Sequence, residues 1–267
     1  MDLQLKGKRA LVTGGSRGIG KAVARALAAE GAHVALLARD AQRLDEAVAE
    51  LQRDTGAVVV AVQADTTRDD EVRAAVSRAA ALLGGPVQVL VNAAAEPAGF
   101  AGPPKLEAIG ADFFHGELDT KVMGYIRASQ AVVPGMRASG WGRIVHVSGL
   151  AARQSGNTVG SIRNVAVAAL TKNMADELGP AGIQVNVVHP GPTRTERTAP
   201  MVARRAAAEG RTEAEVEMQL AAGNSIQHLV TADEVAWVVA FLCSPRSRAI
   251  NGDAIAVGGG APKAIHY

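Results

Sequence analysis

Residues 13–20 of this 267-residue chain, with the sequence TGGSRGIG, have the composition and spacing of a turn that holds phosphate groups. Glycine has no Cβ atom, so the backbone can turn sharply here and a pyrophosphate can approach it closely. An apolar run at 9–12 precedes the turn and an alanine-rich run at 21–30 follows it, which predicts a strand, a turn and a helix. The N-terminus of such a helix offers free N–H groups and a partial positive charge. These features predict a dinucleotide site; the competing interpretation is a plain tight turn.

Two arginines bear on which dinucleotide binds. Arg17 lies inside the glycine turn, and Arg39 follows an apolar run at 33–38. Folds that select NAD carry an acidic residue near the end of this strand, where it bonds the ribose 2′-hydroxyl. Two guanidinium groups suit a 2′-phosphate instead, because they bond it through charge-assisted, bidentate contacts. We therefore predict NADP(H) as the cofactor, preferred over NAD(H). The alternative is that Arg39 is an ordinary solvated residue at a strand end.

Short apolar runs alternate with helical patterns along the rest of the chain. Strands are expected at 9–12, 33–38, 57–62, 87–91, 143–147, 183–188 and 254–257. Helices are expected at 21–30, 41–53, 67–83, 112–138, 165–178, 197–223 and 231–242. Alternation of this kind produces right-handed βαβ units and a parallel sheet, which places the chain in the α/β class. The Gly/Pro-rich stretch at 99–104 is expected to be a loop, so residues 1–267 are predicted to form one domain.

Composition narrows the possible partners and location. The net charge is +2 and the basic residues are scattered, so we expect no nucleic-acid partner. No apolar run reaches the roughly 18 residues of a membrane span. The first strand begins so early that we expect no signal peptide and a cytoplasmic protein. The single cysteine, Cys243, lies in an apolar run and is expected to be a core residue; no metal site is predicted.

The chain resembles the short-chain dehydrogenase/reductase family over nearly its full length. The matching segments are TGGSRGIG at 13–20, Asp65, NAA at 92–94, GRIVHVS at 142–148, LTK at 170–172, ELGP at 177–180, GIQVN at 182–186, Pro190-Gly191 and 250–260. The resemblance implies a single doubly wound Rossmann-type domain with a seven-stranded parallel sheet flanked by helices. It also implies a homotetramer or homodimer, and hydride transfer between a nicotinamide cofactor and a small-molecule carbonyl or alcohol.

The glycine turn and the resemblance together predict the cofactor contacts. These are Gly14, Ser16, Arg17, Gly18, Ile19, Gly20, Arg39, Asp65, Thr66, Asn92, Ala93, Asn164, Pro190, Gly191, Thr193 and Thr195. Thr193 and Thr195 would bond the carboxamide and the pyrophosphate. Asp65 would bond the adenine ring or, alternatively, cap the following helix. The charged, alanine-rich segment 197–223 is expected to be a lid over the substrate.

The catalytic half departs from the family pattern. The family uses a Ser, a Tyr that acts as acid and base, a Lys four residues after the Tyr, and an Asn from the preceding long helix. Ser148 matches the Ser, but Gly160 stands where the Tyr belongs and Asn164 where the Lys belongs. No shift of the alignment restores the motif, because the only tyrosines are Tyr125 and Tyr267.

A lysine occupies the remaining family position: Lys121 stands where the helix Asn belongs. A buried lysine can have a lowered pKa and can serve as acid, base or Schiff-base nucleophile. We therefore predict a rearranged catalytic set of Ser148, Lys121 and His189. The plainer alternatives are a salt bridge for Lys121, packing for His189, and a substrate-orienting role for Ser148. His146 is expected to be a buried hydrogen-bonding residue.

Three functions remain open from the sequence. The first is an NADP(H)-dependent oxidoreductase acting on a carbonyl/alcohol pair with an atypical acid/base. The second is a lyase, isomerase or hydrolase on the same scaffold that uses Lys121. The third is a catalytically silent NADP-binding subunit.

Overall fold

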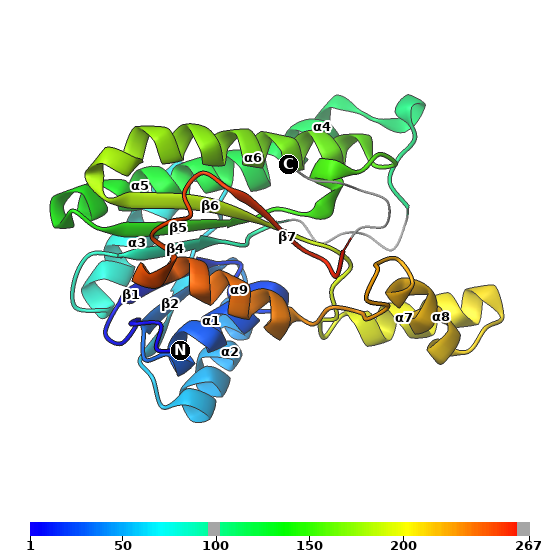
Figure 1. The fold of residues 1–267 in the computed structure, drawn as a ribbon, viewed down its shortest axis with the longest axis horizontal. Coiled ribbons are helices and arrows are strands. Elements are labelled where there is room, and N and C mark those ends of the chain that lie inside the picture. Colours follow the sequence, from blue (N-terminus) through cyan, green and yellow to red (C-terminus); the bar gives the residue numbers. More distant parts are fainter. Residues whose placement is uncertain (96–101, 261–267) are drawn as a thin grey trace.

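The computed structural model describes residues 1–95 and 102–260. The predicted loop at 99–104 lies partly outside these residues, and Tyr267 lies wholly outside them. Within the described chain, seven strands form one parallel sheet in the order β3-β2-β1-β4-β5-β6-β7 (Figure 1). Their bounds are β1 Arg9–Thr13, β2 His33–Ala38, β3 Val59–Gln63, β4 Val89–Asn92, β5 Gly142–Val147, β6 Ile183–Pro190 and β7 Ala254–Val257. The predicted seven-stranded, doubly wound Rossmann-type α/β fold is confirmed.

Helices cover both faces of the sheet (Figure 1). One face packs against α1 (Gly18–Ala29), α2 (Ala41–Thr55) and α9 (Ala232–Cys243). The other packs against α3 (Asp69–Leu82), α5 (Gly124–Ser139) and α6 (Thr158–Leu178).

Strand β2 shows why the apolar runs predicted strands so well. Val34 and Leu36 belong to the core of one face, while Ala35 and Leu37 belong to the core of the other. A strand buried on both sides needs a continuous apolar run rather than an alternating one. Cys243 is also buried in the first of these cores, and burial raises the pKa of its thiol to about 12, which confirms its expected core role.

The long helix expected at 112–138 is present, since the chain is helical without a break from Ala111 to Ser139, but it contains a π-helical segment that was not predicted. Helix α4 covers Ala111–Leu118, a π-helical segment covers Asp119–Met123, and α5 begins at Gly124. A π segment adds a residue to the turn, and such segments occur often at functional sites. Here it carries Lys121.

Helix α6 begins seven residues earlier than the expected start at Val165. Asn157 is its N-cap, and the side-chain oxygen of Asn157 accepts a hydrogen bond from the Gly160 N–H at 2.9 Å. Asn at this position is a recognised start signal for a helix. The region around Gly160 is therefore helical and not part of a loop.

The segment expected as one helix at 197–223 is a pair of helices, α7 (Thr198–Glu209) and α8 (Glu213–Ala221). Gly210 ends α7 in the left-handed conformation with φ of 63°. Thr212 and Glu215 then start α8 with a reciprocal capping box. Both helices project beyond the carboxyl edge of the sheet (Figure 1). Their role as a substrate lid stays a prediction.

Candidate functional site

A cavity of about 490 Å³ opens at the carboxyl ends of β1, β2, β4 and β5. In doubly wound folds, ligands bind where the strand order reverses, which here is between β1 and β4. The predicted residues that line this cavity are Gly14, Ser16, Arg17, Gly18, Ile19, Gly20, Arg39, Asp65, Thr66, Ala93, Lys121, Ser148 and Thr195. The structure thus brings most of the predicted cofactor contacts and two of the three predicted catalytic residues to one place.

Close packing explains the glycines of the turn. A Cβ on Gly14 would lie 2.9 Å from backbone atoms of Ala93, and Gly14 has a φ of 68°. A Cβ on Gly20 would lie 2.3 Å from the Gly14 carbonyl oxygen. The Thr13 hydroxyl accepts hydrogen bonds from the N–H groups of Ala93 at 3.2 Å and Ala94 at 3.3 Å. These contacts join the turn after β1 to the turn after β4 and fix the floor of the cavity.

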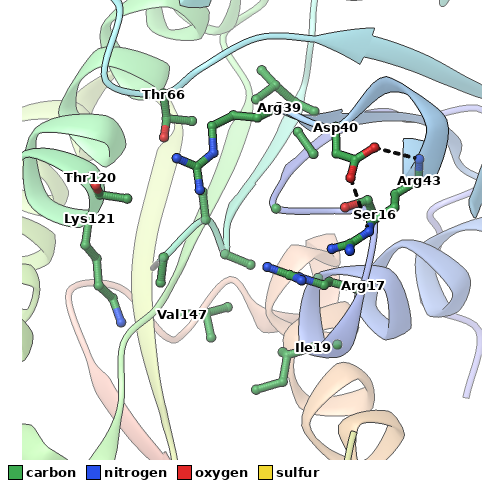
Figure 2. A pocket seen from close by; sticks show the side chains of 18 of the residues that line it. Ser16, Arg17, Ile19, Arg39, Asp40, Arg43, Thr66, Thr120, Lys121 and Val147 are labelled. Atoms are coloured by element: carbon green, nitrogen blue, oxygen red, sulfur yellow. Dashed lines mark hydrogen bonds and ion pairs between the residues drawn. The ribbon is translucent and has the colours of Figure 1, made fainter. Parts of the chain in front are cut away.

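Four arginines line the cavity: Arg17, Arg39, Arg43 and Arg197. The pKa of Arg17 is lowered by burial first, and then by the positive charges of Arg43 and Arg197. Arg43 is held by the Asp40 carboxylate at 3.2 Å (Figure 2). Because like charges this close repel one another, this end of the cavity favours a polyanionic ligand. Sequence reasoning predicted Arg17 and Arg39 but missed Arg43 and Arg197. The one available signal was that Arg43 follows Arg39 by four residues.

A carboxylate contacts the N-terminus of α1. The Gly18 N–H donates to Glu196 Oε1 at 2.7 Å. Glu196 follows Thr195 in the segment between β6 and α7, and Thr195 lines the cavity. The N-terminus of α1 therefore binds an oxyanion in this structure, as its dipole and free N–H groups favour.

Lys121 lies on the opposite side of the cavity from Arg17 and Arg43 (Figure 2). Its residue is 4% exposed, and its Nζ donates to the Ser148 carbonyl oxygen at 3.0 Å. Burial lowers the pKa of Lys121 to about 7; the charge of Arg163 adds to this effect and the charge of Glu117 opposes it. An amine with this pKa can gain or lose a proton near neutral pH.

Tyr125 lies one turn after Lys121 and binds the carbonyl of Val147, the residue before Ser148 at the end of β5. Its hydroxyl donates to the Val147 carbonyl oxygen at 2.7 Å, and burial raises its pKa above the normal value. The two side chains thus bind consecutive carbonyls at the end of β5. Tyr125 remains protonated in a structural role, which leaves Lys121 as the titratable group.

Two hydrogen bonds connect Asn164 of α6 to the turn at Ser148 and Gly149. The Ser148 hydroxyl donates to the Asn164 carbonyl oxygen at 3.2 Å, and Asn164 Nδ2 lies 3.5 Å from the Gly149 carbonyl oxygen. Asn164 is buried, and its Oδ1 has no hydrogen-bond partner among the described residues. Gly160 is also buried, and a Cβ there would lie 2.5 Å from Asn157 Nδ2. The Asn157 side chain thus crowds the position where a tyrosine would begin.

His189 and His146, the two histidines considered in the sequence analysis, both make contacts inside the protein. His189 is buried, and its Nδ1 accepts the Gly149 N–H at 3.4 Å. His189 is not among the described residues that line the cavity. His146 lies with its Nδ1 3.0 Å from the Thr171 hydroxyl, and burial lowers its pKa to about 3. His146 is therefore a neutral core residue, as expected, and the catalytic role of His189 stays a prediction.

Asp65 does not cap α3 directly, because Arg68 is the N-cap of that helix. Its carboxylate accepts hydrogen bonds from the Thr67 N–H and the Thr67 hydroxyl, both at 2.9 Å, and so holds the turn before α3.

The remaining predicted cofactor contacts lie outside the lining of the cavity: Asn92, Asn164, Pro190, Gly191 and Thr193.

Two further findings concern the described residues as a whole. In residues 1–95 and 102–260, no three His, Cys, Asp or Glu side chains lie together as a metal site would require. No helix in that part of the chain is long and apolar enough to cross a membrane.

Comparison with known proteins gives consistent matches. A family model described as enoyl-(acyl carrier protein) reductase matches residues 14–262. The dehydrogenase/reductase SDR family member 4 of Oryctolagus cuniculus is 34% identical over 264 residues, which cover 98% of this chain and 96% of that protein.

Two solved structures are similar as well. L-sorbose reductase from Gluconobacter frateurii, complexed with NADPH and L-sorbose, has a TM-score of 0.91 and 29% identity, over 99% of this chain and 100% of that one. A short-chain dehydrogenase from Burkholderia cenocepacia in complex with NADP has a TM-score of 0.79 and 34% identity, over 96% and 98% of the two chains.

The lowered pKa of Lys121 predicts how stability depends on pH. Between the folded pKa of about 7 and the normal value of 10.5, the unfolded chain binds more protons at this site than the folded chain. The free energy of unfolding therefore gains from this group as pH rises, by at most about 1.4 kcal/mol per pH unit. Lys121→Met removes the titration, so the free energy of unfolding of the wild type should rise relative to that of the variant between pH 7 and 9.

Denaturant unfolding at several pH values measures this difference. Lys172→Met is the matched control, because Lys172 is exposed and pairs with Asp176. A difference between wild type and Lys121→Met that stays constant with pH would contradict the lowered pKa.

Proposed function

This chain belongs to the short-chain dehydrogenase/reductase family, and from that premise we propose that it is an NADP(H)-dependent oxidoreductase with a lysine as its acid and base. The substrate class is a small-molecule carbonyl or alcohol. The observation that carries the proposal is the cavity itself, which has an arginine-rich end that suits a phosphorylated dinucleotide and a buried amine at the other end. The two relatives of known structure described above, solved with NADPH or NADP, support the choice of cofactor.

The residues present fit the dinucleotide. The Gly18 N–H already binds a carboxylate oxygen, which is a stand-in for a pyrophosphate oxygen at the N-terminus of α1. A Cβ at Gly14 would clash with the backbone of Ala93 and Ala94, and a Cβ at Gly20 with the backbone of Gly14, so the turn must have glycine at both positions. We assign the 2′-phosphate to Arg17 and Arg39, with Arg43 as a further cation, because all three residues line the cavity and the charges of Arg39 and Arg43 act on Arg17.

Lys121 replaces the missing tyrosine in this proposal. When bound, NADPH supplies the hydride that reduces the carbonyl carbon. The protonated Lys121 amine gives a proton to the carbonyl oxygen, and solvent restores that proton; in the oxidation direction, the neutral amine accepts the alcohol proton. A pKa of about 7 suits both directions, since a general acid or base works best near the operating pH. The Ser148 side chain, which also lines the cavity, would hydrogen-bond the same substrate oxygen.

Two family positions have exchanged their residue types. The position of the helix Asn holds Lys121, and the position of the Lys holds Asn164. Both contact the turn at Ser148 and Gly149, Lys121 through Ser148 O and Asn164 through its contacts to both residues. The exchange supports a cation that has moved from α6 to the π segment while it still faces the same turn. A ribose contact for Asn164 remains part of the proposal.

Lys121 also supports a second candidate function. A buried amine with a pKa of about 7 that lines a cavity can attack a carbonyl carbon and form a Schiff base. This chemistry would serve a lyase or isomerase on the same scaffold.

The homotetramer or homodimer and the cytoplasmic location expected from the sequence stay predictions.

The arginine-rich end predicts cofactor selectivity. NADPH should bind more tightly than NADH, and Arg39→Ala should weaken NADPH about tenfold or more, because it loses a charge-assisted contact to the 2′-phosphate. NADH binding should change little. Calorimetric titration of nucleotide-free protein measures all four affinities. Arg53→Ala, at the exposed far end of α2, is the control. Equal losses for both cofactors would contradict the assignment of Arg39.

Glu196 predicts a competition for the N-terminus of α1. Its carboxylate holds the Gly18 N–H, so a pyrophosphate must displace it to bind there. Glu196→Gln should therefore tighten NADPH binding several-fold. Glu30→Gln is the matched control, because Glu30 is exposed at the opposite end of the same helix. Unchanged or weaker NADPH binding by the Glu196 variant would show that the contact does not compete with the cofactor.

The central test is Lys121→Met in a carbonyl-reduction screen with NADPH. If Lys121 is the acid and base, kcat should fall by about 10²–10⁴ while the Kd for NADPH stays unchanged. Borohydride trapping of a substrate adduct on Lys121 would favour the lyase or isomerase instead. Tight NADPH binding with no turnover of any carbonyl or alcohol would point to a silent subunit and overturn the oxidoreductase proposal.

A further inference from the structure

A nearly buried ion pair lies beside Lys121. Arg163 Nη1 of α6 contacts Glu117 Oε2 of α4, and the two side chains are only 17% and 16% exposed. Arg163 Nε is also buried and has no hydrogen-bond partner among the described residues. Glu117 precedes the π segment, and Lys121 follows Glu117 by four residues. The pair thus joins α4, which directly precedes the π segment of Lys121, to α6.

The Glu117–Arg163 ion pair affects which hydrogen-bond partner Lys121 has. A Glu four residues before a Lys is a favourable helical pair, so Glu117 would be an ordinary partner for Lys121. Instead, Glu117 is held by Arg163, and the Lys121 amine donates to a neutral backbone carbonyl, that of Ser148. The charged groups that act on Lys121 from the packed elements are Arg163 from α6 and Glu117 from α4.

We propose that the Glu117–Arg163 pair sets the proton affinity of Lys121, because it withholds the Glu117 carboxylate from the amine. Both are positioning residues, since they act through Lys121 and do not themselves line the cavity. The inference deepens the proposed function and rests on it for its catalytic meaning. The protonation of the amine itself can nevertheless be measured without any turnover.

The two members of the pair act with opposite signs. Arg163→Met removes a nearby cation and frees Glu117 to bind Lys121, so the pKa of Lys121 should rise. Glu117→Gln leaves the Arg163 charge uncompensated, so the pKa of Lys121 should fall. Each shift should be about one pH unit or more, the size expected for a nearby charge at an effective dielectric of about 20. The double variant Glu117→Gln/Arg163→Met should lie between the two single variants.

The readout is the reactivity of the amine. Full-length protein is treated with cyanate for a fixed short time at pH values from about 5.5 to 10. Carbamylation of the peptide that contains Lys121 is then quantified by mass spectrometry. The midpoint of the pH curve reports the pKa of the amine. Asp176→Asn is the control, because it breaks an exposed ion pair elsewhere and should leave the Lys121 midpoint unchanged.

Opposite shifts of the two midpoints would support the proposal. Shifts in the same direction, or no shift in either folded variant, would overturn it, because a purely structural pair would loosen the site equally from both sides. If Arg163→Met does not fold, Arg163→Gln is titrated in its place. Opposite midpoint shifts without turnover of any carbonyl would support this proposal while the oxidoreductase function fails.

Discussion

Burial of a lysine amine against a backbone carbonyl is the constraint on which this site depends. A buried charge is costly unless it is paired, and a lysine can avoid that cost by losing its proton. The π segment between α4 and α5 places Lys121 and Tyr125 so that they bind the consecutive carbonyls of Ser148 and Val147. The contacts of Lys121 and Tyr125 therefore also hold the end of β5. The catalytic candidate Lys121 thus helps to position the cavity wall at Ser148.

The rest of the catalytic half is consistent with this arrangement. The Asn157 side chain fills the space beside Gly160 and caps α6, so the helix has a well-formed start around Gly160, the position that the sequence alignment assigns to the tyrosine. Asn164 keeps contact with the Ser148–Gly149 turn without a charge. A second ammonium on α6 would add to the repulsion that Lys121 already receives from Arg163. The neutral Asn164 is thus physically matched to a lysine on the facing element.

The sequence was sufficient for the sheet and the glycine turn because both depend on local patterns. Strand β2 is apolar throughout, and the turn needs glycine at Gly14 and Gly20 for close packing, so each is visible within a few residues. The π segment was missed because its residues fit an ordinary helical pattern. Arg197 and the Glu117–Arg163 pair were missed because their partners are far away in sequence; only the fold brings Arg197 to Arg17, or residue 163 to residue 117.

The two ends of the cavity handle charge in different ways, and this difference bears on mechanism. A guanidinium group carries its positive charge without exchanging a proton, so the arginine-rich end suits an anionic ligand. Lys121 is the opposite case, because burial and a nearby cation bring its pKa to about 7. A reaction that moves a proton must place it on a group that can change its charge. Of the cations that line the described cavity, Lys121 is the one whose surroundings bring its pKa to about 7. In the proposed reaction, we therefore assign the acid/base step to its side of the site.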